Sequence, residues 1–308
     1  MMISNILVVG DVMLDKYLIG TSTRMSPEAP VPIVKIEKMV KLPGGAANVA
    51  SLIANMKVNC LLLGTVGSYL YGKIEDYDLD GYHLKKMLTI PQLHPMLLFN
   101  KEITTVKTRF IVNGIQLARI DEEVILTKPE IHRSVKNNFK SAILADKNIK
   151  VVVFSDYGKG TLGEVQEMIK FCCDRGIVTL VDPKGLNWEK YKSAAILTPN
   201  MSEFEAVVGK CNSEQEIHIK ADKLIKELDL EALLITRSDD GMTLISDTIY
   251  ANFKTDCDNV VDVCGAGDMV IATLAVNLAQ GKSLIEAVKM SEFEATLSVQ
   301  KSRLGNIF

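Results

Sequence analysis

Short runs of apolar residues alternate along the chain with longer segments in which apolar residues recur at helical spacing. The apolar runs predict buried strands at residues 6–9, 60–63, 151–154, 178–181, 196–197 and 232–235. The helical spacing predicts helices at residues 45–56, 162–175, 202–208, 214–228 and 266–280. Strands that are apolar on both faces and alternate with helices are typical of a parallel sheet covered on both sides. The pattern therefore predicts a three-layer α/β fold with a mostly parallel central sheet.

Two segments, residues 30–38 and 96–120, show a different pattern in which apolar and polar residues alternate. Alternation predicts half-buried strands, and we expect antiparallel strands outside the main sheet. These strands could form a small β-sheet lid over a site, or an edge extension of the main sheet. Residues 68–95 show no clear pattern, and no linker divides the sequence. We therefore expect a single domain over residues 1–308, with lid strands from about residues 12–40 and 96–123 inserted in it.

The composition is that of an ordinary globular protein, since the 308 residues are 47% hydrophobic and 24% charged. The 35 Lys and Arg residues against 38 Asp and Glu give a net charge of −3. This balance gives no reason to expect nucleic acid or a membrane as a partner. No apolar run approaches the roughly 18 residues of a membrane-spanning helix. The six cysteines form no Cys-x-x-Cys pair, which indicates free thiols and a cytoplasmic protein.

Polar residues follow the predicted strands at the points where the strands end. These residues are Asp11, Asp156, Asp182, Asn200 and Thr236. In parallel sheets, ligands bind outside the carboxyl ends of the strands. The pattern therefore predicts a line of site residues along that edge of the sheet.

The strongest chemical signal is the segment Val-Asp-Val-Cys-Gly-Ala-Gly-Asp at residues 261–268, which leads directly into a predicted helix. Small residues at a helix N-terminus let backbone N–H groups approach an anion closely. A carboxylate in the first turn, here Asp268, suits a general base that takes a proton from an attacking hydroxyl. The alternative is an ordinary glycine turn with an Asp that favours the helix dipole.

Two further segments combine turn residues with polar side chains at the start of a predicted helix. In residues 42–50, Gly44 and Gly45 precede Asn48, whose amide both donates and accepts and so suits a sugar hydroxyl. A buried helix start is the alternative for this segment. In residues 198–203, the spacing of Asn200 and Glu203 is that of a helix-capping pair, or of a polar pair near Mg²⁺ and phosphates.

Taken together and in this order, Gly10-Asp11, Gly44-Gly45 with Asn48, Asn200 with Glu203, and residues 265–268 resemble the ribokinase (PfkB) family of carbohydrate kinases. The resemblance implies a ribokinase-like fold and a kinase that uses ATP and Mg²⁺ on a small-molecule sugar. It implies that Asp268 is the catalytic base and that the N–H groups of Gly265, Ala266 and Gly267 form an anion hole. The remaining roles that it implies fall into two groups.

The first group binds the nucleotide, with Glu203 also near the metal ion, and comprises Asn200, Met201, Ser202, Glu203, Lys184, Thr236, Arg237 and Gly241. The second group contacts the sugar and comprises Asp11, Asp15, Gly44, Gly45 and Asn48. The resemblance also suggests a homodimer formed through the β-sheet lid. Cys264 and residues 291–295 depart from the family pattern. Of the roles that the resemblance implies, adenine binding is therefore the least supported.

A finer resemblance, in residues 10–15, 22–32 and 197–205, is to the D-glycero-β-D-manno-heptose 7-phosphate kinases. These enzymes make the 1,7-bisphosphate that leads to ADP-heptose and lipopolysaccharide core. A phosphorylated substrate needs cations, and Lys107, Arg109 and Arg24 are the candidates, with a solvated surface residue as the alternative for each. We expect the kinase module without the adenylyltransferase that is fused to it in many bacteria. A kinase for another sugar and a non-catalytic binding homologue are the competing hypotheses.

Overall fold

The computed structural model describes residues 5–71, 74–255 and 260–301. Its main sheet has ten strands, in the order β14-β13-β12-β11-β10-β9-β1-β4-β5, with β6 also paired to β4. The central strands are parallel and comprise β1 (Asn5–Gly10), β4 (Cys60–Tyr71), β6 (Leu93–Asn100), β9 (Ile149–Ser155), β10 (Val178–Asp182), β11 (Ile196–Leu197) and β12 (Ala232–Thr236). Antiparallel strands complete the edges and comprise β5 (Ile74–Tyr77), β13 (Met242–Ser246) and β14 (Tyr250–Phe253).

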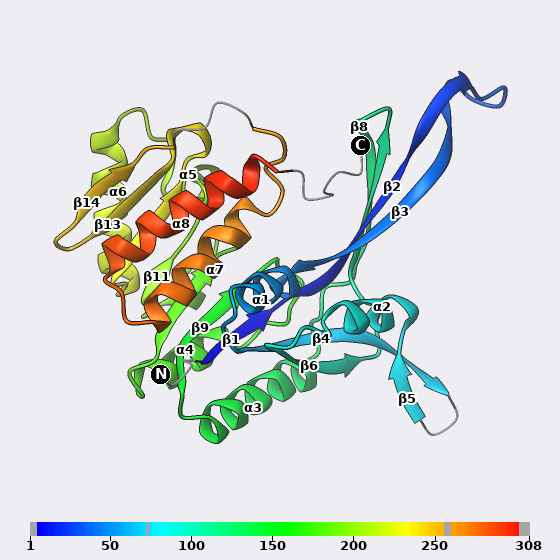
Figure 1. Cartoon of the computed structure of the whole chain (residues 1–308). Coiled ribbons are helices and arrows are strands. Elements are labelled where there is room, and N and C mark those ends of the chain that lie inside the picture. The colour runs from blue at the N-terminus through cyan, green and yellow to red at the C-terminus, as the bar shows by residue number, and fades with distance from the viewer. Residues whose placement is uncertain (1–4, 72–73, 256–259, 302–308) are drawn as a thin grey trace.

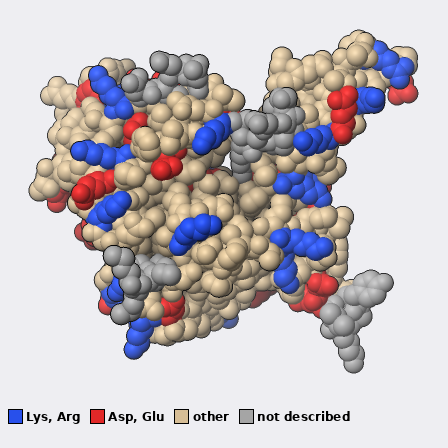
Figure 2. Space-filling view, in the orientation of Figure 1, with Lys and Arg blue, Asp and Glu red and all other residues tan. Residues whose placement is uncertain are grey.

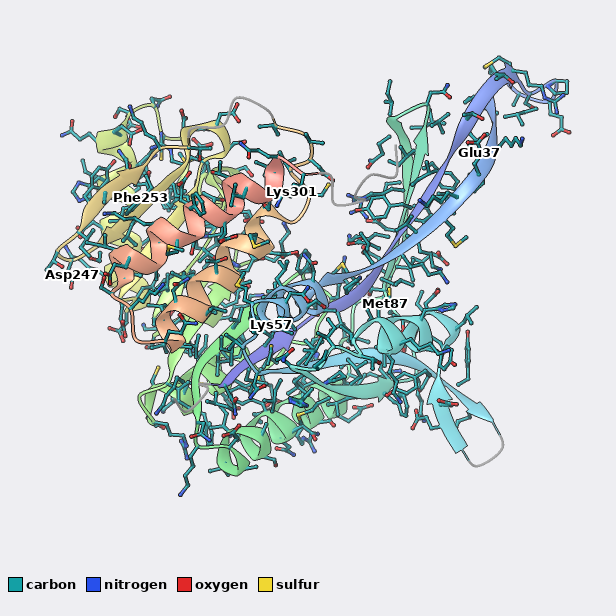
Figure 3. All side chains as sticks on the ribbon, in the orientation of Figure 1. Glu37, Lys57, Met87, Asp247, Phe253 and Lys301 are labelled. Atoms are coloured by element: carbon teal, nitrogen blue, oxygen red, sulfur yellow. The ribbon has the colours of Figure 1, made fainter. Side chains whose placement is uncertain are left out.

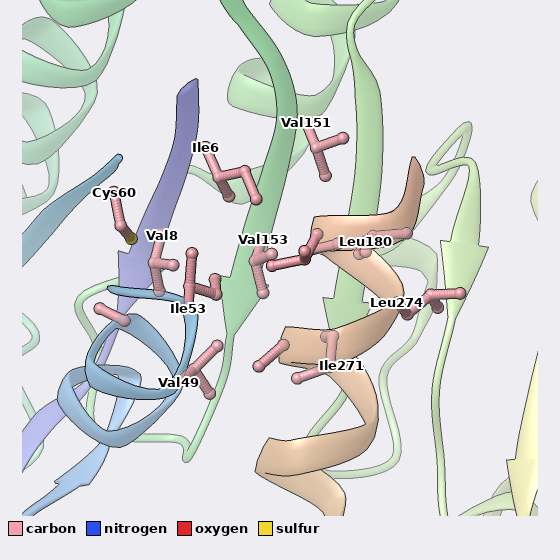
Figure 4. Packing of buried hydrophobic residues seen from close by; sticks show 14 of the residues in the cluster. Ile6, Val8, Val49, Ile53, Cys60, Val151, Val153, Leu180, Ile271 and Leu274 are labelled. Carbon is pink, nitrogen blue, oxygen red and sulfur yellow. The ribbon is translucent and has the colours of Figure 1, made fainter. Parts of the chain in front are cut away.

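Helices cover both faces of this sheet (Figure 1). One face carries α1 (Ala46–Asn55), α2 (Leu79–Met87), α7 (Ala266–Ala279) and α8 (Leu284–Val299). The other carries α3 (Pro129–Ala145), α4 (Val165–Cys173), α5 (Met201–Val208) and α6 (Glu214–Leu228). Figure 4 shows the first face, where Ile6 and Val8 of β1 pack with Val49 of α1 and Ile271 of α7. Alternate residues of β1 pack in two apolar layers, one on each face of the sheet, because successive side chains of a strand point to opposite faces.

A separate sheet of four strands, which we call the small sheet, leaves the body of the molecule (Figure 1). Its strand order is β3-β2-β7-β8, with β2 (Val12–Met25), β3 (Pro32–Gly45), β7 (Val106–Val112) and β8 (Ile115–Glu122). Strand β2 begins two residues after β1 ends, and β3 runs directly into α1. Glu37, on β3, lies far from the body (Figure 3). The small sheet is therefore tied to the main sheet at the end where β1 stops.

The predicted three-layer α/β fold is confirmed, but two expectations about the alternating segments are wrong. Residues 96–100 belong to β6 in the main sheet, where they pair in parallel with β4. Strand β6 lies near the sheet edge and is half exposed, so its alternation resembled that of a separate sheet. The small sheet is also not wholly antiparallel, because β2 and β7 run parallel. The single-domain expectation stays a prediction.

Smaller differences concern the ends of elements and the segment that showed no pattern. Helix α4 begins at Val165 and not at residue 162, because residues 161–164 form a turn. The end of β4, β5, α2 and the start of β6 fall within residues 68–95. Among the described residues, every helix is too short or too polar to span a lipid bilayer. Lys and Arg are interspersed with Asp and Glu over the face shown in Figure 2, with no extended region of one sign.

Candidate active site

The N-termini of α1 and α7 bring two of the predicted motifs into contact. Gly45 caps α1 and Gly265 caps α7, and the two helices lie side by side on one face of the sheet (Figure 4). The side-chain amide of Asn48 donates to Oδ2 of Asp268 over 2.6 Å. The two glycine motifs, distant in sequence, thus form one site.

Asp268 lies in the first turn of α7 and is only 7% exposed. Its second carboxylate oxygen, Oδ1, accepts a hydrogen bond from the hydroxyl of Tyr157 over 3.0 Å. Burial, together with the charge of Asp268, raises the pKa of Tyr157 well above its usual value, so the phenol remains protonated. A buried carboxylate at a helix N-terminus with a donor on each oxygen is held in a fixed orientation.

Asp11 organises the loop that follows β9. Its Oδ2 accepts the backbone N–H groups of Tyr157 and Lys159 over 2.9 Å each, and its Oδ1 accepts that of Thr161 over 3.0 Å. Burial raises the pKa of Asp11, and the amide donors oppose that shift. The structure thus gives Asp11 a loop-holding role that the sequence did not suggest, and its expected contact with the sugar stays a prediction.

Asp15 and Arg109 form an ion pair of 2.8 Å between β2 and β7, with side chains only 5% and 13% exposed. The Arg109 guanidinium also lies 5.3 Å from the centre of the Tyr17 ring. Gly44 leaves room for this pair, because a Cβ at residue 44 would lie 2.7 Å from Oδ2 of Asp15. The predicted sugar contacts Asp15, Gly44 and Gly45 and the predicted cation Arg109 are therefore neighbours.

Lys107 shares the face of Asp15, its register partner on β2, but it is engaged by carboxylates. It lies 3.3 Å from Asp121 and 3.8 Å from Glu123, and Lys159 lies 2.6 Å from the same Glu123. Arg24 is exposed and lies nine residues beyond Asp15 on β2, about 30 Å along an extended strand. The structure therefore does not bring Arg24 to the site with Lys107 and Arg109.

A cavity of about 500 Å³ opens beside Ala266 and Gly267, in the glycine turn that precedes Asp268. Six of the residues predicted to bind the nucleotide line it, namely Asn200, Met201, Ser202, Thr236, Arg237 and Gly241. The opposite wall comes from α7 and α8 and includes Ala266, Gly267, Glu292, Ala295 and Thr296. Residues 291–295 of α8, which depart from the family pattern, thus contribute to this wall.

Glu203 and Lys184 lie beside this cavity and pair with each other over 2.8 Å. Asn200 and Glu203 also form the capping box of α5, because the Asn200 side chain accepts the Glu203 N–H and Glu203 accepts the Asn200 N–H. The helix-capping alternative for Asn200 and Glu203 is therefore confirmed, and the role of this pair near the metal ion stays a prediction. The capping box holds both side chains at the carboxyl end of β11.

A divalent cation fits this corner of the site in chemical terms. Asp182, Asp268 and Glu203 lie close enough to interact, because burial, followed by the charges of Asp268 and Glu203, raises the pKa of Asp182 well above its usual value. Within the described residues, no three His, Cys, Asp or Glu side chains are grouped to hold a metal ion on their own. Mg²⁺ usually takes one or two carboxylates together with substrate phosphates, which agrees with both observations.

Comparison with known proteins decides the family. Residues 119–307 match the model of the pfkB family carbohydrate kinases. The chain is 42% identical over 305 residues to "Bifunctional protein HldE" of Pasteurella multocida (strain Pm70), and 41% identical over 302 residues to that of Klebsiella pneumoniae (strain 342). The chain belongs to the pfkB family of carbohydrate kinases. Each of these alignments covers 97% of this kinase, which spans about 60% of the length of the curated relatives.

Solved structures agree with the fold of this kinase. It superimposes on phosphofructokinase-2 from Escherichia coli in complex with potassium with a TM-score of 0.80, at 18% identity over 98% of this chain and 94% of that one. It superimposes on ribokinase from Arabidopsis thaliana complexed with ribose and ATP with a TM-score of 0.71, at 18% identity and with the same coverage. The predicted ribokinase-like fold is therefore confirmed.

The site also contains residues that the sequence did not single out. Tyr157 contacts Asp268 although it comes from the loop after β9, and Lys159 of the same loop reaches Glu123. The signal that could have found them is the segment Asp-Tyr-Gly-Lys-Gly at residues 156–160, which follows a buried strand. Glycines at alternate positions in such a loop indicate a tight wrap around a ligand or a side chain.

Proposed function

We propose that this kinase transfers the γ-phosphoryl group of ATP to the anomeric 1-hydroxyl of D-glycero-β-D-manno-heptose 7-phosphate, giving the 1,7-bisphosphate. The structural observation that supports phosphoryl transfer is the buried Asp268 carboxylate, which directly follows Gly267 in the turn that lines the nucleotide cavity. The choice of sugar is supported by 41–42% identity to proteins named HldE and by the heptose-kinase segments of the sequence.

In this proposal Asp268 accepts the proton of the 1-hydroxyl as the sugar oxygen bonds to the γ-phosphorus and ADP leaves. Gly267 borders the cavity, and a Cβ there would meet no atom within 4 Å, so a phosphate has access to this turn. The Ala266 N–H donates to Val263 O over 3.2 Å and is engaged within the turn itself. The helix N-terminus and the open backbone at Gly267 stabilise the charge that develops on the transferred group.

The cavity beside the turn takes ATP, with Arg237 and Gly241 on one wall and α8 on the other. Glu203 and Asn200 lie where they would hold Mg²⁺ together with the phosphates, and Lys184 would approach the phosphates on leaving Glu203. Mg²⁺ supplies neutralisation of phosphate charge when it is bound. The capping box holds in place the oxygens of Asn200 and Glu203 that would be ligands of Mg²⁺.

The sugar phosphate binds between the small sheet and the carboxyl end of β1. Arg109 and Lys107 supply positive charge on the face of the small sheet that carries Asp15. Arg109 presents a planar guanidinium that suits bidentate contact with a phosphate. The small sheet then acts as the lid that excludes water from the site.

We also propose a cytoplasmic homodimer formed through the small sheet. The strands of this sheet carry exposed large apolar side chains, namely Met25, Ile36, Met39, Ile115, Leu117 and Ile120, and Val31 is exposed in the connection between β2 and β3. Apolar residues on unpaired sheet surfaces are commonly covered by a partner. Related proteins include a tetrameric form of phosphofructokinase-2.

The deciding experiment is phosphorus NMR of the product that the purified chain forms from ATP, Mg²⁺ and the heptose 7-phosphate. A new anomeric phosphate signal beside the unchanged 7-phosphate signal supports the proposal. A parallel panel of ribose, fructose 1-phosphate and a ketodeoxy sugar acid, followed by ADP release, tests the competing kinase specificities. Turnover of one of these without turnover of the heptose would refute the substrate assignment.

A further inference from the structure

We infer that Tyr157 is a positioning residue for Asp268 and that Asp11 acts on the reaction by holding the loop that carries Tyr157. This inference rests on the proposed role of Asp268 as the general base. It concerns how that carboxylate is oriented and kept charged, and it assigns Tyr157 a role that the motifs do not show.

Each carboxylate oxygen of Asp268 accepts a hydrogen bond from a different side chain. The Tyr157 hydroxyl donates to Oδ1 over 3.0 Å, and the Asn48 amide donates to Oδ2 over 2.6 Å. One donor on each oxygen sets the plane of the carboxylate, and a carboxylate oxygen can accept more than one hydrogen bond. A sugar hydroxyl can therefore donate to Asp268 without displacing either donor.

Tyr157 acts as a donor and not as a second base. Burial, with the charges of Asp268, Asp182 and Asp15, raises its pKa well above the usual value for tyrosine. The phenol therefore keeps its proton throughout the working pH range. It stabilises the charged form of Asp268, because a hydrogen bond to a carboxylate favours the ionised state.

The buried side chain of Asp11 accepts three backbone hydrogen bonds from the loop that carries Tyr157. Residues 157, 159 and 161 each donate a backbone N–H to Asp11, which is 2% exposed. Gly160 makes this wrap possible, because its φ is +97° and a Cβ there would lie 2.1 Å from Leu126 O. Asp11 on one side and Leu126 on the other thus hold the backbone of the loop, and the N–H of Tyr157 donates directly to Asp11.

Other charged groups around Asp268 also influence its titration. Asp182 of β10 has a pKa raised by burial and by the charges of Asp268 and Glu203, and Glu203 of α5 pairs with Lys184. Asp15 of β2 is compensated by Arg109 of β7, and the donor from α1, Asn48, is neutral. Since these groups stay in place in a Tyr157→Phe variant, a change in the titration of Asp268 would report the lost hydroxyl.

The test compares Tyr157→Phe with the parent chain in steady-state assays across pH. We expect kcat to fall about tenfold, with the KM values for sugar and ATP within about threefold, because one hydrogen bond to a charged group is lost. We expect the acid limb of the kcat profile to move up by about one pH unit. Tyr77→Phe is the matched control, because its ring packs on Phe99 outside the site and its profile should equal the parent's. An unchanged profile and kcat for Tyr157→Phe would refute the inference.

Asp268→Asn separates this inference from the function on which it rests. If Asp268→Asn abolishes turnover while Tyr157→Phe matches the parent, the base assignment stands and the role of Tyr157 is wrong. If Asp268→Asn retains the parent kcat, both assignments fail. A second variant, Asp11→Asn, disturbs the loop without touching Asp268, and it should move the acid limb in the same direction as Tyr157→Phe. An Asp11→Asn chain that folds, shown by an unaltered circular dichroism spectrum, but keeps the parent acid limb would refute the link through Asp11.

Discussion

The Asn48 amide donates to Oδ2 of Asp268 over 2.6 Å, although the two residues are 220 positions apart in the chain. The contact joins the first turn of α1 to the first turn of α7. It places a neutral donor and a buried carboxylate together, where Gly267 lines the cavity directly before Asp268 and β3 of the small sheet ends directly before α1.

Asp268→Asn should reduce kcat by about a thousandfold, because the amide cannot take the proton of the attacking hydroxyl. Binding of the sugar phosphate should change by no more than about threefold, since the amide has nearly the same shape. Rates of ADP release and calorimetric titration with sugar phosphate measure the two quantities. A kcat close to that of the parent chain would show that another group is the base.

Asn48→Asp should place a second carboxylate within hydrogen-bonding distance of Asp268. Two adjacent carboxylates cannot both ionise easily, so the pKa of the pair rises and the base is protonated up to a higher pH. The acid limb of the kcat/KM profile should therefore move to higher pH, with activity recovering as the pH increases. Asn48→Ala is the control, because it removes the donor without adding charge and should cause a smaller movement.

Lys107→Met should raise the KM for the phosphorylated sugar about tenfold while leaving kcat within about twofold, because a charged contact to the substrate is lost. The matched control is Arg119→Met, which removes an exposed cation that pairs with the same Asp121. Steady-state assays with varied sugar phosphate measure both variants. Equal KM values for Lys107→Met and the parent chain would exclude Lys107 from the substrate site.

Gly160→Ala should lower the free energy of unfolding by about 3 kcal/mol, because the residue has a positive φ and no room for a Cβ beside Leu126 O. Gly176→Ala is the matched control, since Gly176 also has a positive φ but nothing lies within 4 Å of a Cβ there. Its cost should be about 1 kcal/mol, from backbone strain alone. Urea denaturation followed by fluorescence gives both values, and equal losses would contradict the close approach at Gly160.

The proposed dimer can be tested by sedimentation. The parent chain should sediment at twice its chain mass, and a chain carrying both Met39→Lys and Ile120→Lys should sediment as a monomer, because two exposed apolar residues of the small sheet become charged. Leu144→Lys is the control, since Leu144 is an exposed residue of α3 on the main body. A parent chain that sediments as a monomer at micromolar concentration would refute the dimer.

Much of the fold could be read from local pattern. The buried strands at β1, β9 and β10 are continuous apolar runs, and the helix at residues 214–228 has the expected bounds because Ser213 caps it and its apolar stripe is regular. Strand β6 was misplaced because a half-exposed edge strand and a separate sheet show the same alternation. Arg24 was a poor candidate because charge alone carries no information on distance from the site.

By itself, the sequence determined the buried parallel strands of the main sheet other than β6, which glycines begin helices and that Asp268 lies in a first helical turn. These properties depend on neighbours a few positions away, so local steric and hydrophobic rules are sufficient for them. Only the tertiary structure decided that Asn48 and Tyr157 hold the two oxygens of Asp268, and that Asp11 is committed to the loop at 157–161. Such pairings depend on the order of strands in the sheet, because strand order determines which carboxyl ends are neighbours.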